Sequence, residues 1–293
     1  MKRLLVVAGT SICVVALNAR AQEAGNVTSL PEVRVSEELI REEAAVGPYQ
    51  QPEWTTQRRF PSTRVYLQQP PWGVGVEQWW RGQWPRGEGA NYRFQEEIEV
   101  GLPHRFQLDL YENWRINEDG RVFHHDVATE VRWALADWGK IPLNPTLYGE
   151  WKFVDPAHGS DVYELKLLLG EELAPRWHWG FNAVYEQEVG GGRATEFGAS
   201  MAVSYTVIDE KLSAGVEMKL QSETETGARN NAPIEFDIGP SIQWRPTRNS
   251  HVDIVPLFGV TSDSPHVEAY IVVGFDFGPG NEHHAAPKSL QSK

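Results

Sequence analysis

The chain has 293 residues and a formal net charge of −13, from 40 acidic and 27 basic residues. This balance excludes a general affinity for nucleic acid, because such an affinity needs a basic surface. The only cysteine, Cys13, lies in the first 21 residues. We therefore expect neither a disulfide nor a cysteine-ligated metal site in the rest of the chain, and we predict no cofactor and no metal.

The first 21 residues read as a secretory signal peptide. A basic start, Met1-Lys2-Arg3, precedes an apolar stretch from Leu4 to Leu17 and a small-x-small site at Ala19-Arg20-Ala21. The apolar stretch is too short to cross a bilayer as a helix. A buried N-terminal helix or anchor is the alternative. The order of the three regions favours export, with cleavage near Ala21/Gln22.

Residues 22–72 are rich in proline and polar side chains, and no apolar periodicity persists there. This composition predicts an extended or disordered arm in the periplasm. Part of it resembles the TonB box, the segment by which energised receptors pair as a strand with TonB: Leu30, Pro31, Glu32, Val33, Arg34 and Val35. The resemblance implies TonB, or another periplasmic protein, as a partner. Those receptors have much larger barrels, so a chance match in a flexible arm is the alternative.

From about residue 73 the apolar residues recur with a period of two, as in β-strands. In residues 92–102, for example, Phe94, Ile98 and Val100 alternate with glutamine and glutamates. The pattern predicts twelve strands: 73–84, 92–102, 105–116, 122–138, 146–154, 161–171, 176–188, 194–207, 211–222, 232–245, 251–261 and 266–277. Most are longer than the roughly five or six residues usual in soluble sheets, and they match tilted strands that cross a bilayer.

Short connections alternate with longer ones, which is typical of an up-and-down barrel with both termini on the periplasmic side. A soluble sheet could also bury one face of such strands. Charges well inside the strands and aromatic residues near their ends favour a membrane barrel. The predicted fold is therefore all-β: an up-and-down antiparallel transmembrane β-barrel of about twelve strands over 73–277. The arm at 22–72 precedes it, and a flexible tail at 278–293 follows.

The signal peptide, the twelve alternating strands and the last strand together resemble Gram-negative outer-membrane proteins. The last strand carries Phe275 and Phe277 near its end. In those proteins a terminal aromatic residue serves as the assembly signal. The resemblance implies an outer-membrane location in contact with outer-membrane lipid, and insertion by the barrel-assembly machinery. The chain departs from the pattern because its tail follows the final aromatic residue. Its length and strand count also resemble small outer-membrane transporters.

The polar strand faces would project into one lumen. The charged residues that we expect to line it are Glu97, Glu99, Asp109, Arg115, Glu164, Lys166, Glu186, Glu217, Lys219, Glu235, Asp237, Asp253 and Glu268. An acidic lumen favours cations. The sequence therefore predicts a channel or transporter for small solutes that prefers cations. An ion-paired, closed lumen that only stabilises the barrel is the alternative.

Two other functions compete with a channel. The 12 tryptophans are compatible with a soluble, secreted or periplasmic β-sandwich that binds a glycan or another ligand. A lipid-modifying barrel enzyme would need a catalytic set, and the concentrated candidate is His124-His125-Asp126 with Glu130 further along the strand. Residues His124, Asp126 and Glu130 would share one strand face under regular alternation. No serine stands out as a partner, so a polar loop edge is the simpler interpretation, and we assign no catalytic residue.

Overall fold

The computed structural model describes residues 40–116, 119–230 and 232–278. The predicted signal peptide, the TonB-box-like segment and the predicted tail beyond Gly278 lie outside these residues. In the part of the chain that is described, no helix has the length and apolar character needed to cross a membrane.

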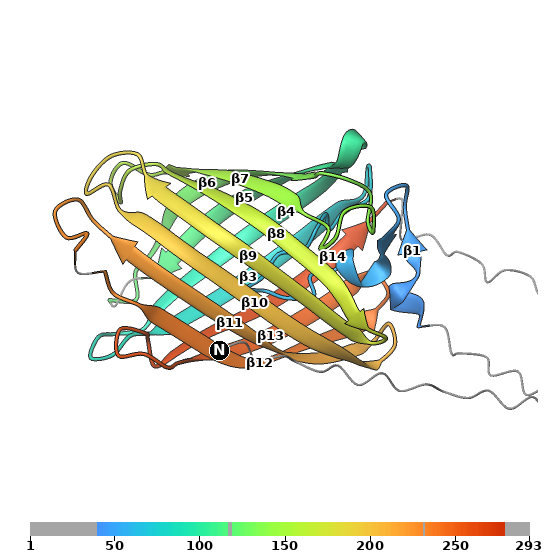
Figure 1. Cartoon of the computed structure of the whole chain (residues 1–293). Helices are drawn as coiled ribbons and strands as arrows, with labels where there is room; N and C mark the ends of the chain where they lie inside the picture. The colour runs from blue at the N-terminus through green and yellow to red at the C-terminus, as the bar shows by residue number, and fades with distance from the viewer. Residues whose placement is uncertain (1–39, 117–118, 231, 279–293) are drawn as a thin grey trace, which may run out of the picture. The chain divides into compact units, whose positions relative to one another are not determined.

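The described residues form a closed barrel of twelve antiparallel strands, as predicted (Figure 1). Each strand pairs with its neighbours in the sequence, and the last strand pairs with the first. The strands are β3 (Val74–Trp84), β4 (Asn91–Leu102), β5 (Phe106–Ile116), β6 (Val122–Ala134), β7 (Thr146–Val154), β8 (Val162–Ala174), β9 (Trp177–Glu188), β10 (Thr195–Ile208), β11 (Leu212–Thr224), β12 (Glu235–Thr247), β13 (Ser250–Gly259) and β14 (Val267–Phe277).

The two rims of the barrel differ. Strand β3 begins and β14 ends at one rim, where connections such as Pro103–Arg105 are short. The other rim carries longer connections such as 225–234. Strand β6 ends at Ala134 and not at residue 138, because the chain turns there and Trp138 N donates to the Tyr49 carbonyl at 2.9 Å.

The barrel is apolar outside and polar inside. Along β4, Ile98 is 48% exposed, whereas its neighbours Glu97 and Glu99 are fully buried in the lumen. This reverses a soluble barrel and is the arrangement of a membrane-spanning one. Phe275 and Phe277 also lie on the outer surface.

Aromatic residues near the strand ends pack on one another outside, as Phe106 does on Trp133 with ring centroids 5.7 Å apart. Two aromatic residues near predicted strand ends do not belong to this outer belt. Tyr148 points into the lumen, where it lines a cavity, and Trp138 packs against a buried cluster at the short-turn rim.

One row of polar side chains interrupts the apolar exterior. Gln78, Glu96 and Glu112 are register partners on β3, β4 and β5, near the middle of each strand. Glu96 and Glu112 are exposed, and the nearest basic group to Glu112 is His124 Nε2 at 3.8 Å. Ionisable groups facing lipid at this depth are costly.

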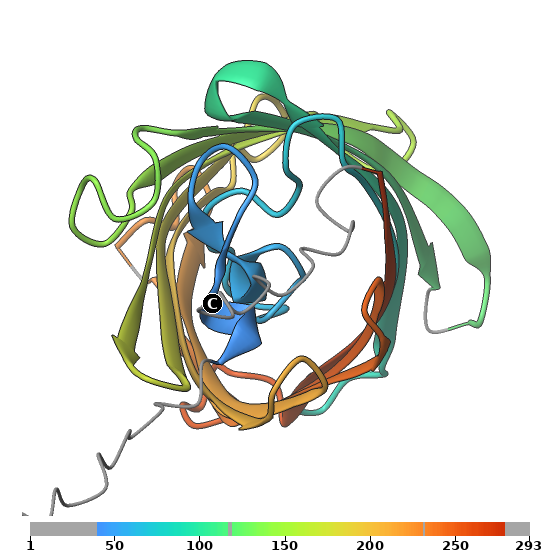
Figure 2. The same cartoon turned by 90° about the vertical axis from the view of Figure 1, so that its right-hand side faces the viewer.

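Residues 40–72, which we call the lumen plug, fill part of the ring of strands when it is viewed along its axis (Figure 2), and β1 lies at the mouth of the barrel, beyond the strand ends (Figure 1). The lumen plug contains η1 (Arg41–Glu43), β1 (Ala45–Val46), β2 (Gln51–Pro52) and η2 (Glu53–Thr55). The prediction of an extended or disordered arm is therefore wrong for these residues. Their order comes from contacts with the barrel wall, which a local pattern does not show.

A small apolar cluster holds the lumen plug at the short-turn rim. It is formed by Trp54, Phe60, Val65, Tyr66, Leu67, Ala134 and Ala202. Val65 packs on two glycines that are register partners on β8 and β9, Gly170 and Gly180. A Cβ at these positions would lie 2.3 and 2.6 Å from Val65 side-chain atoms. The wall therefore needs glycine, which has no side chain, at both positions.

A charge on the outer face tests the membrane-spanning arrangement. We expect Ile98→Lys to destabilise the barrel by about 2–4 kcal/mol, because it places an ammonium group in lipid near the middle of β4. The measurement is unfolding in lipid vesicles, followed by gel mobility without boiling. Gln95→Lys is the matched control, since Gln95 faces the cavity on the same strand. Equal effects of the two changes would contradict the assignment of the faces.

Candidate functional site

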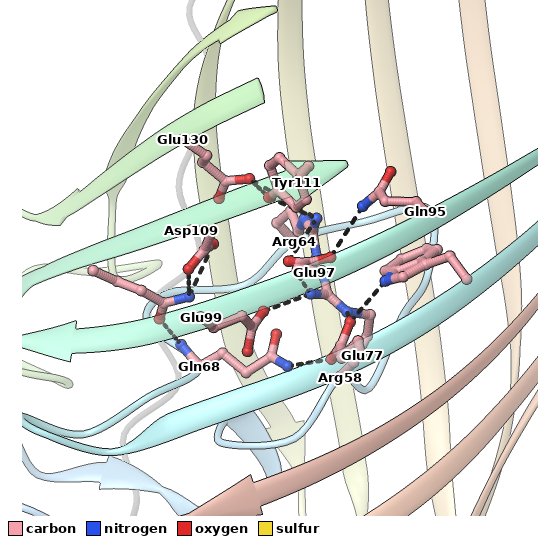
Figure 3. A network of polar contacts seen from close by, with 12 residues as sticks. Arg58, Arg64, Gln68, Glu77, Gln95, Glu97, Glu99, Asp109, Tyr111 and Glu130 are labelled. Carbon is pink, nitrogen blue, oxygen red and sulfur yellow. Dashed lines mark hydrogen bonds and ion pairs between the residues drawn. The ribbon is translucent and has the colours of Figure 1, made fainter. Parts of the chain in front are cut away.

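The site is built around Arg58 of the lumen plug (Figure 3). Its Nε donates to Glu77 Oε2 at 2.7 Å, and its Nη2 donates to Glu97 Oε1 at 3.0 Å and Glu99 Oε1 at 2.7 Å. The Arg58 side chain is only 2% exposed, and its guanidinium lies 4.7 Å from the centroid of the Trp79 ring. The three glutamates come from adjacent strands, so one arginine joins the lumen plug to β3 and β4.

Two further arginines extend this network. Arg64 of the lumen plug donates to the Tyr111 hydroxyl at 3.2 Å and lies 3.5 Å from Glu97. Arg132 on β6 pairs with Asp109 at 2.9 Å and also contacts Glu130. The buried carboxylates of Glu77, Glu97, Glu99, Asp109 and Glu130 are thus matched by three arginines, two of which belong to the lumen plug.

The backbone and amide groups of the lumen plug bond to side chains of the wall. Ser62 N donates to Glu217 Oε2 at 2.8 Å. Arg64 N donates to Asn182 Oδ1 at 2.8 Å, and Asn182 returns a bond to the Arg64 carbonyl at 2.7 Å. The backbone N–H groups of Gln68 and Gln69 both donate to Gln107 Oε1. These bonds satisfy polar groups that the lumen would otherwise leave unpaired.

The end of the lumen plug near η1 is also tied by charge. Arg59 Nη2 lies 2.9 Å from Glu42 Oε1, and Arg245 Nη2 on β12 lies 3.0 Å from Glu53 Oε1. Burial raises the pKa of Glu42 above its ordinary value, and the neighbouring Arg59 opposes this rise. Ion pairs therefore hold the lumen plug both in its middle, at Arg58 and Arg64, and near η1.

A cavity of about 570 Å³ lies between the lumen plug and the long-loop rim. Pro61, Ser62 and Arg64 form its floor. Its walls carry as many basic as acidic side chains: Arg81, Arg93, Arg115, Lys152, Lys166 and Lys219 with Arg64, against Asp126, Glu150, Glu164, Glu186, Glu196, Glu223 and Glu235. The sequence-based picture of an acidic lumen does not describe this space.

The charged residues expected in the lumen fall into two levels. Those that line the cavity are Arg115, Glu164, Lys166, Glu186, Lys219 and Glu235. Those that are buried in the wall around the lumen plug or beside the cavity are Glu97, Glu99, Asp109, Glu217, Asp237, Asp253 and Glu268. The sequence analysis missed Arg58, Arg64, Glu77 and Arg132. The predicted lumen contained more acidic than basic residues, which indicated that basic groups from another part of the chain would be needed to pair with them.

The histidine-rich start of β6 does not form the set that regular alternation predicts. A register shift opposite Asn113 and Trp114 changes the face on which the following residues lie. His124 packs edge-to-face against Trp114 outside the lumen, whereas His125 and Asp126 line the cavity, with His125 Nδ1 2.6 Å from Asp126. His124 is therefore not on the same face as Asp126 and Glu130.

The three glutamates around Arg58 bring carboxylate oxygens within 4.8 Å of one another. That spacing could hold a metal ion. In the structure the positive charge at this point is the guanidinium of Arg58, so the lumen plug itself supplies the cation that the glutamates require.

No protein-family model matches the sequence, and the search of curated proteins found no match either. Solved structures share the fold. An outer membrane channel from Pseudomonas putida F1 superposes with a TM-score of 0.54 at 9% identity, over 72% of this chain and 98% of that one. The NanC porin gives 0.49 at 14% identity over 69% and 98%, and the KdgM porin 0.47 at 10% over 70% and 99%. The barrel is thus the kind of fold found in outer-membrane channels.

Removing Arg58 tests the network. We expect Arg58→Ala to weaken protection of residues 40–72 by about 3–5 kcal/mol, because three buried carboxylates lose the charged group that they share. Hydrogen exchange of backbone amides in the lumen plug measures this. Arg41→Ala is the control, since that side chain is 63% exposed beside Glu210. Unchanged protection in Arg58→Ala would show that the network does not hold the segment.

Proposed function

We propose that the protein is an outer-membrane channel or transporter for small solutes, closed on its short-turn side by the lumen plug. The apolar exterior fits a lipid environment, and the closed barrel leaves no sheet edge exposed to it. The polar cavity offers a path from the long-loop rim down to Pro61, Ser62 and Arg64. The observation that carries the proposal is the burial of Arg58 among three wall glutamates.

Passage of solute then depends on the lumen plug leaving its position or shifting within it. With the lumen plug in place, its arginines neutralise the wall. When it shifts away, Glu77, Glu97 and Glu99 face the lumen without Arg58. An acidic constriction lowers the energy of cations, so cation preference belongs to the open state.

A protein in the outer membrane would contact the partners that the sequence indicates. Lipid would cover the apolar band, and the barrel-assembly machinery would read the last strand with Phe275 and Phe277 on its outer face. A periplasmic partner such as TonB would act on the chain before residue 40, which leads directly into the lumen plug. Tension there is a physical means of displacing η1 and the residues after it.

The two competing functions have less support. A β-sandwich has two open sheets, whereas here β14 pairs with β3 and the ring closes. A lipid-modifying enzyme needs a nucleophile beside a base. In residues 40–116, 119–230 and 232–278, no hydrogen bond joins a serine to His124 or His125, and His125 is held by Asp126.

Charge reversal at Arg58 tests the proposal. We expect Arg58→Glu to raise the conductance of the purified protein in planar bilayers several-fold and to shift its reversal potential towards cation selectivity. The reason is that a fourth carboxylate among three others repels the lumen plug. Arg41→Glu makes the same change in charge on an exposed side chain, and its conductance should equal that of the unaltered protein. Folding of each variant is checked by its mobility without boiling.

Two results would count against a plugged channel. One is a large, steady conductance of the unaltered protein that Arg58→Glu leaves unchanged. The other is recovery of the exported protein in the soluble periplasmic fraction, with no difference in mobility between boiled and unboiled samples.

A further inference from the structure

The cavity above the lumen plug has a basic wall. Arg81, Arg93 and Arg115 lie on β3, β4 and β5, and all three line the cavity. Arg81 is the register partner of Arg93, and Arg93 is the register partner of Arg115. The three guanidinium groups therefore form a row across adjacent strands.

The cavity also has an acidic wall of the same form. Glu186, Glu196 and Glu223 lie on β9, β10 and β11 and line the cavity. Glu186 is the register partner of Glu196, which is in turn the register partner of Glu223. Glu235 on β12 adds a further carboxylate to this side of the cavity, beside Gln221 at 3.2 Å.

The two rows face each other across the lumen. In the ring of twelve strands, β4 and β10 are six positions apart in either direction, so they stand on opposite sides. Both rows lie near the long-loop ends of their strands. Arg93 is close to the start of β4 and Glu196 to the start of β10, and both strands begin at that rim. The rows are therefore at a similar depth.

In each row, one end residue forms an ion pair with a residue of opposite charge, and the other two residues do not. Arg81 pairs with Glu268, and Glu186 pairs with Lys152 at 2.5 Å. Among the described residues, Arg93 has a hydrogen bond to Asn113 at 3.1 Å but no ion pair, and Arg115 has neither. Glu196 and Glu223 likewise have no ion pair within the ranges that the structure describes.

The other charged groups of the cavity are already engaged. Asp126 lies on β6, the strand that follows the basic row. Its carboxylate is bonded to Asn113 and His125 at 2.6 Å each. Lys166 pairs with Glu164 at 2.6 Å, and Lys219 pairs with Glu268. In the part of the chain that the structure describes, none of these groups forms a direct ion pair with Arg93, Arg115, Glu196 or Glu223.

Like charges that lie opposite each other on adjacent strands are unfavourable unless a counter-charge is shared between them. A carboxylate is the natural partner of two neighbouring guanidinium groups, because its two oxygens accept paired hydrogen bonds. An ammonium group fulfils the same role for two neighbouring carboxylates. One solute can satisfy both walls only if it carries both groups at separated positions.

We propose that the cavity is a binding site for zwitterionic solutes of the ω-amino acid type. The solute carboxylate binds Arg93 and Arg115, and its ammonium group binds Glu196 and Glu223. This names the solute class of the channel proposed above and rests on that function for its physiological role. It also explains why the cavity is balanced in charge although the whole chain carries a net charge of −13.

The test is calorimetric titration of the full protein in detergent with 6-aminohexanoate, compared with hexanoate and hexylammonium. We expect the zwitterion to bind about tenfold or more tightly than either singly charged analogue, because it gains charge-assisted bonds at both walls. Glycine, whose two charges lie close together, is expected to bind no more tightly than hexanoate.

Two double variants locate the site. Arg93→Gln with Arg115→Gln, and separately Glu196→Gln with Glu223→Gln, should each reduce the affinity for 6-aminohexanoate to that of the analogue which lacks the corresponding charge. Arg86→Gln is the control, since Arg86 bonds to backbone carbonyls such as that of Ser264 and does not line the cavity. Its affinity for 6-aminohexanoate should match that of the unaltered protein.

Equal affinity for 6-aminohexanoate and hexanoate in the unaltered protein would overturn the proposal, as would tight binding that survives both double variants. These outcomes are separate from those that concern the channel. Selective binding by a protein that never conducts would contradict the channel and support the site. Conductance without selective binding would support the channel and contradict the site.

Discussion

The contact between the Arg58 guanidinium and buried glutamates of two neighbouring strands is the interaction on which the proposed closure of the lumen depends. Its bonds to Glu77, Glu97 and Glu99 are each 3.0 Å or shorter. A buried ion pair adds little net stability over an apolar replacement, but loss of one partner is costly because the other charge stays buried. Arg58 therefore holds the lumen plug in one position more than it stabilises the barrel.

The need for such a residue follows from the barrel itself. A β-sheet in lipid must close so that no backbone group is left unpaired, and its apolar face must turn outward. Every second side chain then points inward, and in this chain many of those are acidic. Carboxylates crowded in a narrow lumen require either water or cations. On the short-turn side the lumen plug supplies Arg58 and Arg64 in addition to Arg132 of the wall, and on the long-loop side Lys152, Lys166 and Lys219 pair with neighbouring carboxylates.

The two levels of the lumen therefore have different roles. Around Arg58, the charged side chains pair with one another, and none of these groups is available to bind a solute. In the cavity above, Arg93 and Arg115 face Glu196 and Glu223 across the ring, and these charges remain for a ligand. In the proposed mechanism, entry of a dipolar solute depends on these unpaired charges of the cavity, whereas movement of the lumen plug depends on the ion pairs around Arg58.

The strands could be predicted from the sequence because their signal is local. Alternation predicted a strand at 92–102, and β4 spans Asn91–Leu102. The lumen plug could not be predicted in this way, because its order depends on residues distant in sequence, such as Ser62 and Glu217, which are 155 positions apart.

Two smaller errors have the same kind of cause. The register shift near the start of β6 moves His124 away from Asp126, and strict alternation contains no information about bulges. The expectation of an acidic lumen left out Arg58 and Arg64 from the preceding segment, and also Arg81, Lys152 and Arg132 on the strands.

A reversible lock on the lumen plug tests its role most directly. Thr63 Oγ1 lies 3.0 Å from Ser200 Oγ on β10, and no cysteine occurs after Cys13, so Thr63→Cys with Ser200→Cys introduces a single pair of thiols. The pair is placed in the Arg58→Glu protein, and bilayer conductance is recorded before and after addition of a reductant. The account predicts low conductance while the disulfide is intact and a several-fold rise once it is reduced. Equal conductance in the two states, with the disulfide shown to form, would contradict closure by residues 40–72.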